Sequence, residues 1–69
     1  MPLFIYTYAS PEHGGRTVTL DCWADTAEAA AQRAGAFLRP LNARLKRAGG
    51  RAIRLPGAAE MRLEARDAE

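Results

Sequence analysis

The sequence of 69 residues contains one cysteine, one histidine and no long apolar run. A single cysteine excludes an intramolecular disulfide, and one Cys with one His cannot supply the four ligands of a structural zinc site. No stretch approaches the ~20 consecutive apolar residues that a transmembrane helix needs. The start, MPLFIYTYASPE, lacks the basic region of a secretory signal peptide. A lone cysteine also suits a reducing compartment, so we expect a cytoplasmic protein without metal or other cofactor.

The chain is too short for more than one domain, which would span residues 1–69. A domain of this size buries only about 60% of the surface of its unfolded chain. Small domains are commonly stabilised by disulfides, a metal or a partner chain. Because the sequence offers neither of the first two, it predicts either very efficient packing or oligomerisation, including a homodimer.

The stretch from Arg33 to Arg54 contains no acidic residue, although the net charge of the whole chain is only +2. The cations of this stretch are Arg33, Arg39, Arg44, Lys46, Arg47, Arg51 and Arg54. Such an asymmetric distribution predicts a basic surface that faces an anionic partner.

Two segments near the N-terminus have the residue types of β-strands, LFIYTY (Leu3–Tyr8) and RTVTLDCW (Arg16–Trp23). In the second, Val18, Leu20 and Cys22 alternate with residues of the other face, which is the period of a strand. The intervening ASPEHGGR contains a proline and a Gly-Gly pair, which are turn signals. The two segments are therefore expected to form a hairpin.

Helical spacing replaces this alternation in DTAEAAAQRAGAFLRPLNARLKRAGG. The apolar positions with this spacing are Ala30, Ala34, Phe37, Leu38, Leu41, Leu45 and Ala48. Asp25 is expected to cap the helix, with Glu28 reaching back, and Gly49-Gly50 to end it. Pro40 removes an internal hydrogen bond. We therefore expect a kinked helix, or two short helices with Pro40 at the start of the second.

The last part of the chain, RAIRLPGAAEMRLEAR, contains a second pair of strand signals. Ile53 and Leu55 precede Pro56-Gly57, which suits the centre of a type II turn. From 59 to 66, apolar and charged residues alternate, although the residue types favour a helix. The predicted order is ββαββ, an α+β domain in which one kinked or split helix packs on one face of an antiparallel sheet.

The first strand has apolar side chains on both faces, so pairing parity decides which face is buried. If Tyr6 lies opposite Thr19, the rings of Phe4, Tyr6 and Tyr8 lie on the open face. If Tyr6 lies opposite Val18, the rings lie in the core. A buried Tyr6 needs a hydrogen-bond partner, and the helix offers no obvious one. The sequence thus favours rings on the open face, and the buried arrangement stays as the alternative.

The candidate partner-binding residues are aromatic and basic. Tyr6, Tyr8 and Trp23 are candidate anchors, because Tyr and Trp contribute strongly to interfaces. The candidate cations are Arg33, Arg44, Lys46, Arg47, Arg51 and Arg54. On a helical wheel, one side of the apolar stripe carries Arg33, Arg44 and Arg47. The nearly opposite side carries Arg39 and Lys46. Arginine forks suit phosphates and carboxylates. The alternative interpretation is a solvated helix face.

No set of residues suggests catalysis. His13 lies beside Glu12 in a Gly-rich loop, and Cys22 lies in the middle of a strand, on the face opposite Asp21. A catalytic base needs an oriented partner and a nucleophile within reach. We therefore expect no enzymatic activity, with His13 as a turn residue and Cys22 as a small core residue.

The segment TVTLDCWADTAEAAAQRA is a strand that runs into a capped, Ala-rich helix after a very short turn. With the order ββαββ in so short a chain, it resembles small phage-encoded inhibitors, among them anti-CRISPR proteins. The resemblance is one of architecture and carries no diagnostic motif. It implies a viral, non-enzymatic protein that binds a host CRISPR complex and blocks DNA binding or nuclease recruitment.

The leading hypothesis is a binding module that docks on a host protein or nucleoprotein complex through its Arg-rich surface. A second hypothesis is a protein that binds DNA or RNA, with the same arginines on phosphates. Phosphate binding weakens steeply as salt rises, whereas a protein partner with aromatic anchors survives moderate salt. A third hypothesis is a self-associating subunit whose open sheet face forms a two-fold dimer interface.

Overall fold

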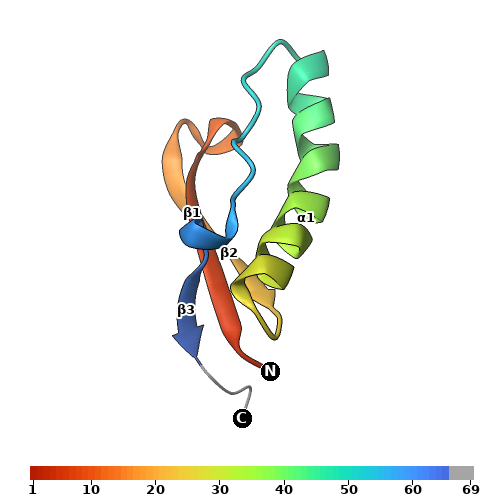
Figure 1. Ribbon diagram of the computed structural model, residues 1–69. Helices are drawn as coiled ribbons and strands as arrows, with labels where there is room; N and C mark the ends of the chain where they lie inside the picture. The colour runs from red at the N-terminus through yellow and green to blue at the C-terminus, as the bar shows by residue number, and fades with distance from the viewer. Residues whose placement is uncertain (66–69) are drawn as a thin grey trace.

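The computed structural model describes residues 1–65 and contains an antiparallel sheet in one layer and a long helix in the other (Figure 1). The strands and the helix are β1 (Leu3–Ser10), β2 (Arg16–Trp23), α1 (Ala27–Arg47) and β3 (Arg62–Ala65). Two 3₁₀ turns, Pro11–His13 and Ala58–Glu60, precede β2 and β3. The order of the strands in the sheet is β2-β1-β3. The α+β class predicted from the sequence is confirmed, with three strands in place of four.

The predicted hairpin of β1 and β2 is confirmed, and its turn follows from the glycines. Gly14 and Gly15 have φ values of 65° and 83°, in the region that favours glycine. The Gly15 N–H donates to the Ser10 carbonyl at 2.8 Å, which closes the turn. The register that results pairs Ser10 with Arg16 and Leu3 with Trp23.

Both ends of α1 are capped, although not in every detail as expected. Thr26, and not Asp25, is the N-cap, because its backbone is extended and its side chain accepts from the Ala29 N–H at 3.1 Å. At the other end, Gly49 has a φ of 81° and its N–H donates to the backbone carbonyl of Lys46. The Gly50 N–H donates to the Leu45 carbonyl at 2.8 Å. These two bonds form a Schellman motif, so the predicted Gly-Gly stop is confirmed.

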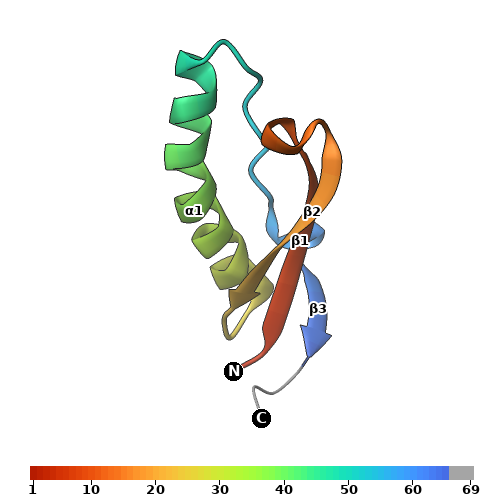
Figure 2. The ribbon, with the colours of Figure 1, turned by 180° about the vertical axis from the view of Figure 1, so that it is seen from behind.

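Pro40 does not divide the helix, so the prediction of two short helices is wrong. The helix runs continuously through this position, as the view from behind shows (Figure 2). The missing N–H would have bonded the carbonyl of Ala36, and both residues lie on the exposed side of the helix. Water can therefore satisfy that carbonyl, which lowers the cost of the proline.

The segment between α1 and β3 does not form the predicted third strand. Residues 50–57 have no regular structure, and the Asn42 side chain bonds both backbone groups of Ile53. The predicted type II turn is also wrong, because Gly57 has a φ of −94° where that turn needs a positive value. The last strand begins at Arg62 and not at 59, and Arg66, its last predicted residue, lies outside the described residues.

The rings of β1 point into the core, so the expectation that they lie on the open face is wrong. Tyr6 lies opposite Leu20, and Tyr8 lies opposite Val18. Phe4 and Tyr6 are only 8% and 6% exposed. The acceptor for the Tyr6 hydroxyl comes from the segment after the helix and not from the helix itself. The burial of a tyrosine in mid-strand is therefore compatible with a satisfied hydroxyl.

The core lies between the ring-bearing face of the sheet and α1. Its helical members are Ala30, Ala34, Leu38, Leu41 and Leu45, and the others are Phe4, Tyr6, Cys22, Ala24, Ile53 and Met61. The small alanines of the first helical turns let the helix approach the sheet closely. Cys22 is a buried core residue, as predicted. Within the described residues, no helix combines the length and hydropathy required to cross a bilayer.

Candidate binding surface

A groove runs between β1 and the segment that follows α1, and we call it the edge groove. The residues that define it are Tyr6, Thr7, Tyr8 and Ala9 of β1, with Arg51, Arg54 and Arg62 around them. The arginine side chains are exposed at its margin. Because this groove combines a strand edge with three cations, it is the strongest candidate for a binding site.

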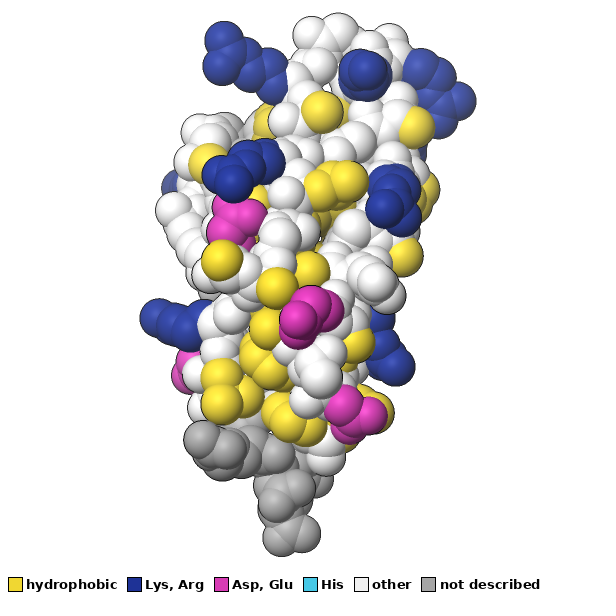
Figure 3. Space-filling model, viewed as in Figure 1, with side chains coloured by type: hydrophobic (Ala, Val, Ile, Leu, Met, Phe, Trp, Pro, Cys, Tyr) yellow, Lys and Arg dark blue, Asp and Glu magenta, His cyan; other side chains and the backbone are white. Residues whose placement is uncertain are grey.

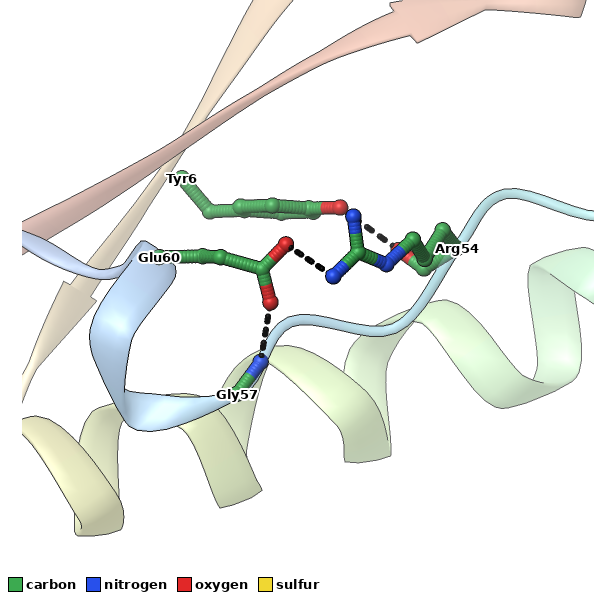
Figure 4. A network of polar contacts seen from close by, with 4 residues as sticks. All are labelled: Tyr6, Arg54, Gly57 and Glu60. Atoms are coloured by element: carbon green, nitrogen blue, oxygen red, sulfur yellow. Dashed lines mark hydrogen bonds and ion pairs between the residues drawn. The ribbon is translucent and has the colours of Figure 1, made fainter.

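A network of polar contacts fixes one wall of the edge groove (Figure 4). The Tyr6 hydroxyl donates to the Arg54 carbonyl at 2.7 Å. The Arg54 guanidinium forms an ion pair with Glu60 at 2.7 Å, and the second Glu60 oxygen accepts from the Gly57 N–H at 2.7 Å. The side chain of Arg54 is nevertheless 79% exposed. The network thus holds Arg54 in place while its remaining N–H groups face solvent.

Asn42 fixes the same segment from the helix side. Its Nδ2 donates to the Ile53 carbonyl at 2.8 Å, and its Oδ1 accepts from the Ile53 N–H at 2.7 Å. Ile53 is buried, whereas Arg51 and Arg54 on either side are exposed. Sequence reasoning missed this role of Asn42. The signal in the sequence was an uncharged polar residue, Asn42, between the apolar positions Leu41 and Leu45 of the helix.

A second groove lies between α1 and the hairpin turn, and we call it the helix groove. The residues that define it are Phe37, Pro40, Leu41, Arg44 and Arg47 of the helix, with Tyr8, Ser10, Glu12 and His13. Ser10 is buried, and its hydroxyl lies 2.9 Å from Nδ1 of His13. Phe37 is 55% exposed beside the two arginines. Tyr8 lines both grooves, so the two lie next to each other.

The predicted partner-binding residues are therefore divided among several places. Arg44 and Arg47 belong to the helix groove, and Arg51 and Arg54 to the edge groove. The remaining predicted cations, Arg33 and Lys46, are exposed but line neither groove. Tyr6 is buried, and its ring stacks on Tyr8 at a centroid distance of 5.6 Å. Trp23 is 39% exposed and lies opposite Leu3, on the other face of the sheet.

Basic side chains are most numerous in the upper half of the face that Figure 3 shows, while acidic side chains are more frequent below. Among the arginines of the edge groove, Arg54 is paired with Glu60 and Arg62 with Glu64, the latter at 3.4 Å. The Arg62–Glu64 pair is exposed on both sides, and such pairs hold their partners weakly, whereas the Glu60 side chain is only 29% exposed. An incoming carboxylate or phosphate can therefore compete most readily for the Arg62 guanidinium.

Two titratable groups near the core are held in their neutral forms. Burial raises the pKa of the Tyr6 phenol, with the Glu60 carboxylate adding to the effect and Arg54 opposing it. Burial also raises the pKa of the Cys22 thiol, with Asp21 adding to it and Arg33 opposing it. A thiol in this state is a poor nucleophile. Within residues 1–65, no three His, Cys, Asp or Glu side chains gather to hold a metal ion.

Comparison of the chain with protein-family models, with curated proteins and with solved structures finds no match.

Proposed function

We propose that the protein is a non-catalytic binding module that docks on an acidic surface of a macromolecular partner. The observation that supports this proposal best is the double anchoring of the segment between α1 and β3. Asn42 and Tyr6 hold the backbone of that segment from two sides, and Arg51 and Arg54 project from it into solvent. A backbone that is already fixed loses little conformational freedom of its own when a partner binds its side chains.

The kind of module proposed is a small phage or mobile-element inhibitor of the anti-CRISPR type. It would act in the cytoplasm of the host cell, on a host protein or nucleoprotein complex. The short chain, the small α+β fold and the exposed arginines support this assignment. Charge complementarity of this kind gives fast association and selects against partners of the same charge.

A pull-down from the lysate of the native host tests the proposal. The tagged protein is used with and without nuclease, at two salt concentrations. We expect a stoichiometric protein band that persists after nuclease treatment. The band should weaken at the higher salt without being lost, because salt screens the contacts of the arginines only in part. The variant Arg51→Glu should lose this band. Arg39→Glu makes the same change of charge at an exposed helical position that lines neither groove, and should retain it.

A nucleic-acid-binding protein is the second candidate, and one observation favours it. The helix groove places the exposed ring of Phe37 beside Arg44 and Arg47. An aromatic platform next to cations is the arrangement on which single-stranded nucleic acid stacks. In the same pull-down, this candidate predicts nucleic acid alone, lost at the higher salt. That result would overturn the proposal of a protein partner.

A further inference from the structure

The strand β1 is paired over its whole length on one side and over only part of its length on the other. On one side β2 pairs with every residue of β1 from Leu3 to Ser10, whereas on the other side β3 pairs only with Leu3, Phe4 and Ile5. The later half of β1 therefore has a free edge among the described residues. A free edge presents unpaired backbone donors and acceptors to any chain that approaches.

The backbone groups at this edge can be assigned from the alternation of an antiparallel pair. The Ala24 N–H donates to the Pro2 carbonyl at 3.1 Å. By the alternation of an antiparallel pair, the backbone N–H and C=O groups of the even-numbered residues of β1 therefore point toward β2. The N–H and C=O groups of Thr7 and Ala9 consequently point away from β2. Both residues are exposed, and both line the edge groove. Their four backbone groups have the spacing that an added strand would match.

We propose that the edge groove binds an extended acidic peptide segment of the partner, which adds to β1 as a strand beside Thr7 and Ala9. This inference rests on the proposed function and specifies how the partner is recognised. The added strand would continue the line of β3 along the same edge of β1. Main-chain hydrogen bonds supply affinity in strand addition, and side chains at alternate positions supply specificity.

The cations around the groove determine the charge of the peptide. Arg51, Arg54 and Arg62 line the groove beside the free edge. Alternate side chains of an extended strand are about 7 Å apart and point to one side. Carboxylates at alternate positions of the peptide can therefore meet more than one guanidinium at once.

The free edge also distinguishes a peptide from other occupants. Nucleic-acid phosphates accept hydrogen bonds but donate none, so they cannot satisfy the carbonyls of Thr7 and Ala9. A second copy of this chain, paired through the same edge, would bring the arginines of the two grooves together. Like charges in close contact oppose such a pairing. An acidic peptide can form hydrogen bonds with the backbone groups of Thr7 and Ala9 and ion pairs with the arginines of the groove.

The outer edge of β2 provides an internal control. By the same alternation, the backbone groups of Thr17, Thr19 and Asp21 point away from β1. Among the described residues this edge has no partner strand either. It carries the Asp21 carboxylate, however, and no arginine lies between Thr17 and Trp23. An acidic peptide should therefore prefer the edge of β1.

The test is a titration of the full ¹⁵N-labelled chain with an acetylated and amidated peptide of four Glu-Thr repeats. We expect chemical-shift changes and at least threefold slower amide exchange at Thr7 and Ala9, with no such change at Thr19 or Asp21. The same peptide methylated at its backbone nitrogens should bind at least tenfold more weakly, because it cannot donate to the strand. A peptide of four Lys-Thr repeats should not bind.

Two variants separate this inference from the proposed function. Ala9→Pro removes a donor from the β1 edge, and Thr19→Pro removes one from the β2 edge, which tests for a general effect of proline. Circular dichroism checks that each is folded. Ala9→Pro should lose the peptide and the host partner, and Thr19→Pro should retain both. If Ala9→Pro fails to fold, the methylated peptide decides the matter with the unaltered chain.

Several results would overturn the strand addition. One is peptide binding that perturbs only the helix groove and leaves the exchange of Thr7 and Ala9 unchanged. Another is equal affinity for the methylated peptide. A third is capture of the host partner by folded Ala9→Pro at the level of the unaltered chain. This last result would reject the strand addition while the docking module itself stands.

Discussion

The two faces of the sheet carry similar apolar side chains from β1 but differ in what covers them. On the inner face, Phe4 and Tyr6 lie under α1 and the segment that follows it, and are 8% and 6% exposed. On the outer face, Leu3 and Ile5 are half-buried, and no element of the described chain packs over them. The difference shows that the buried face is the one that other segments of the chain can cover. For Tyr6, this cover includes a carbonyl that accepts the hydrogen bond of its hydroxyl.

Truncation of an inner ring should have the largest effect on stability. Tyr6→Ala removes a buried ring and its hydrogen bond to Arg54, and should lower the free energy of unfolding by about 3–5 kcal/mol. Urea denaturation followed by circular dichroism measures this loss. The control is Ile5→Ala on the outer face, which should cost clearly less because Ile5 is only half-buried. Equal losses for the two variants would show that the faces do not differ.

Removal of the Asn42 side-chain amide should have the second largest effect. Asn42→Ala deletes both hydrogen bonds to Ile53 and should cost about 2 kcal/mol, since a buried backbone group loses its partner. Amide exchange of Ile53 should accelerate, because the segment is no longer tied to the helix. Gln32→Ala changes an exposed amide on the same helix and should leave the stability almost unchanged. An unchanged exchange rate at Ile53 would refute the anchoring role of Asn42.

Loss of the Tyr6 hydroxyl alone should have a smaller effect, with a defined dependence on pH. Tyr6→Phe should cost about 1 kcal/mol at neutral pH. The pKa of this phenol is raised above its ordinary 10.0, so the folded state favours the neutral form. The stability that results is fully present below pH 10.0 and is lost as the pH rises through the native pKa.

The comparison of Tyr6→Phe with the unaltered chain therefore depends on pH. The stabilities of the two proteins should differ at pH 8 and converge above pH ~10, in thermal denaturation at each pH. Tyr8→Phe is the matched control, because the Tyr8 hydroxyl has no hydrogen bond among the described residues. A constant difference between the unaltered chain and Tyr6→Phe across this range would exclude the proposed coupling.

The features that the sequence predicted correctly depend on residues close together in the chain. The hairpin turn follows from Gly14 and Gly15, and the end of the helix follows from Gly49 and Gly50. The face of β1 that is buried depends instead on an acceptor at Arg54, 48 residues away from Tyr6. Local pattern contains no information about such a contact. The preference for exposed rings failed for this reason.

The last strand and the edge groove illustrate the same limit. The alternation from 59 onward is typical of a strand, but Glu60 caps a 3₁₀ turn and pairs with Arg54, so the strand begins later. The exposed arginines at 51 and 54 were predicted from charge alone. The free edge at Thr7 was not, because it exists only where β3 ends, and pairing between distant segments determines that point.

The smallest expected effect tests whether the outer face is free. Thr19 lies opposite Thr7 on this face, and both are exposed. Thr19→Lys should change the free energy of unfolding by about 0.5 kcal/mol or less, because the new charge stays in water. Ala34→Lys is the contrasting variant on the inner side, where Ala34 is 0% exposed and a charge would be buried.

The midpoint of unfolding of the unaltered chain should not depend on its concentration. A concentration-dependent midpoint that Thr19→Lys abolishes would mean that a second copy covers the outer face, and would favour the self-associating subunit.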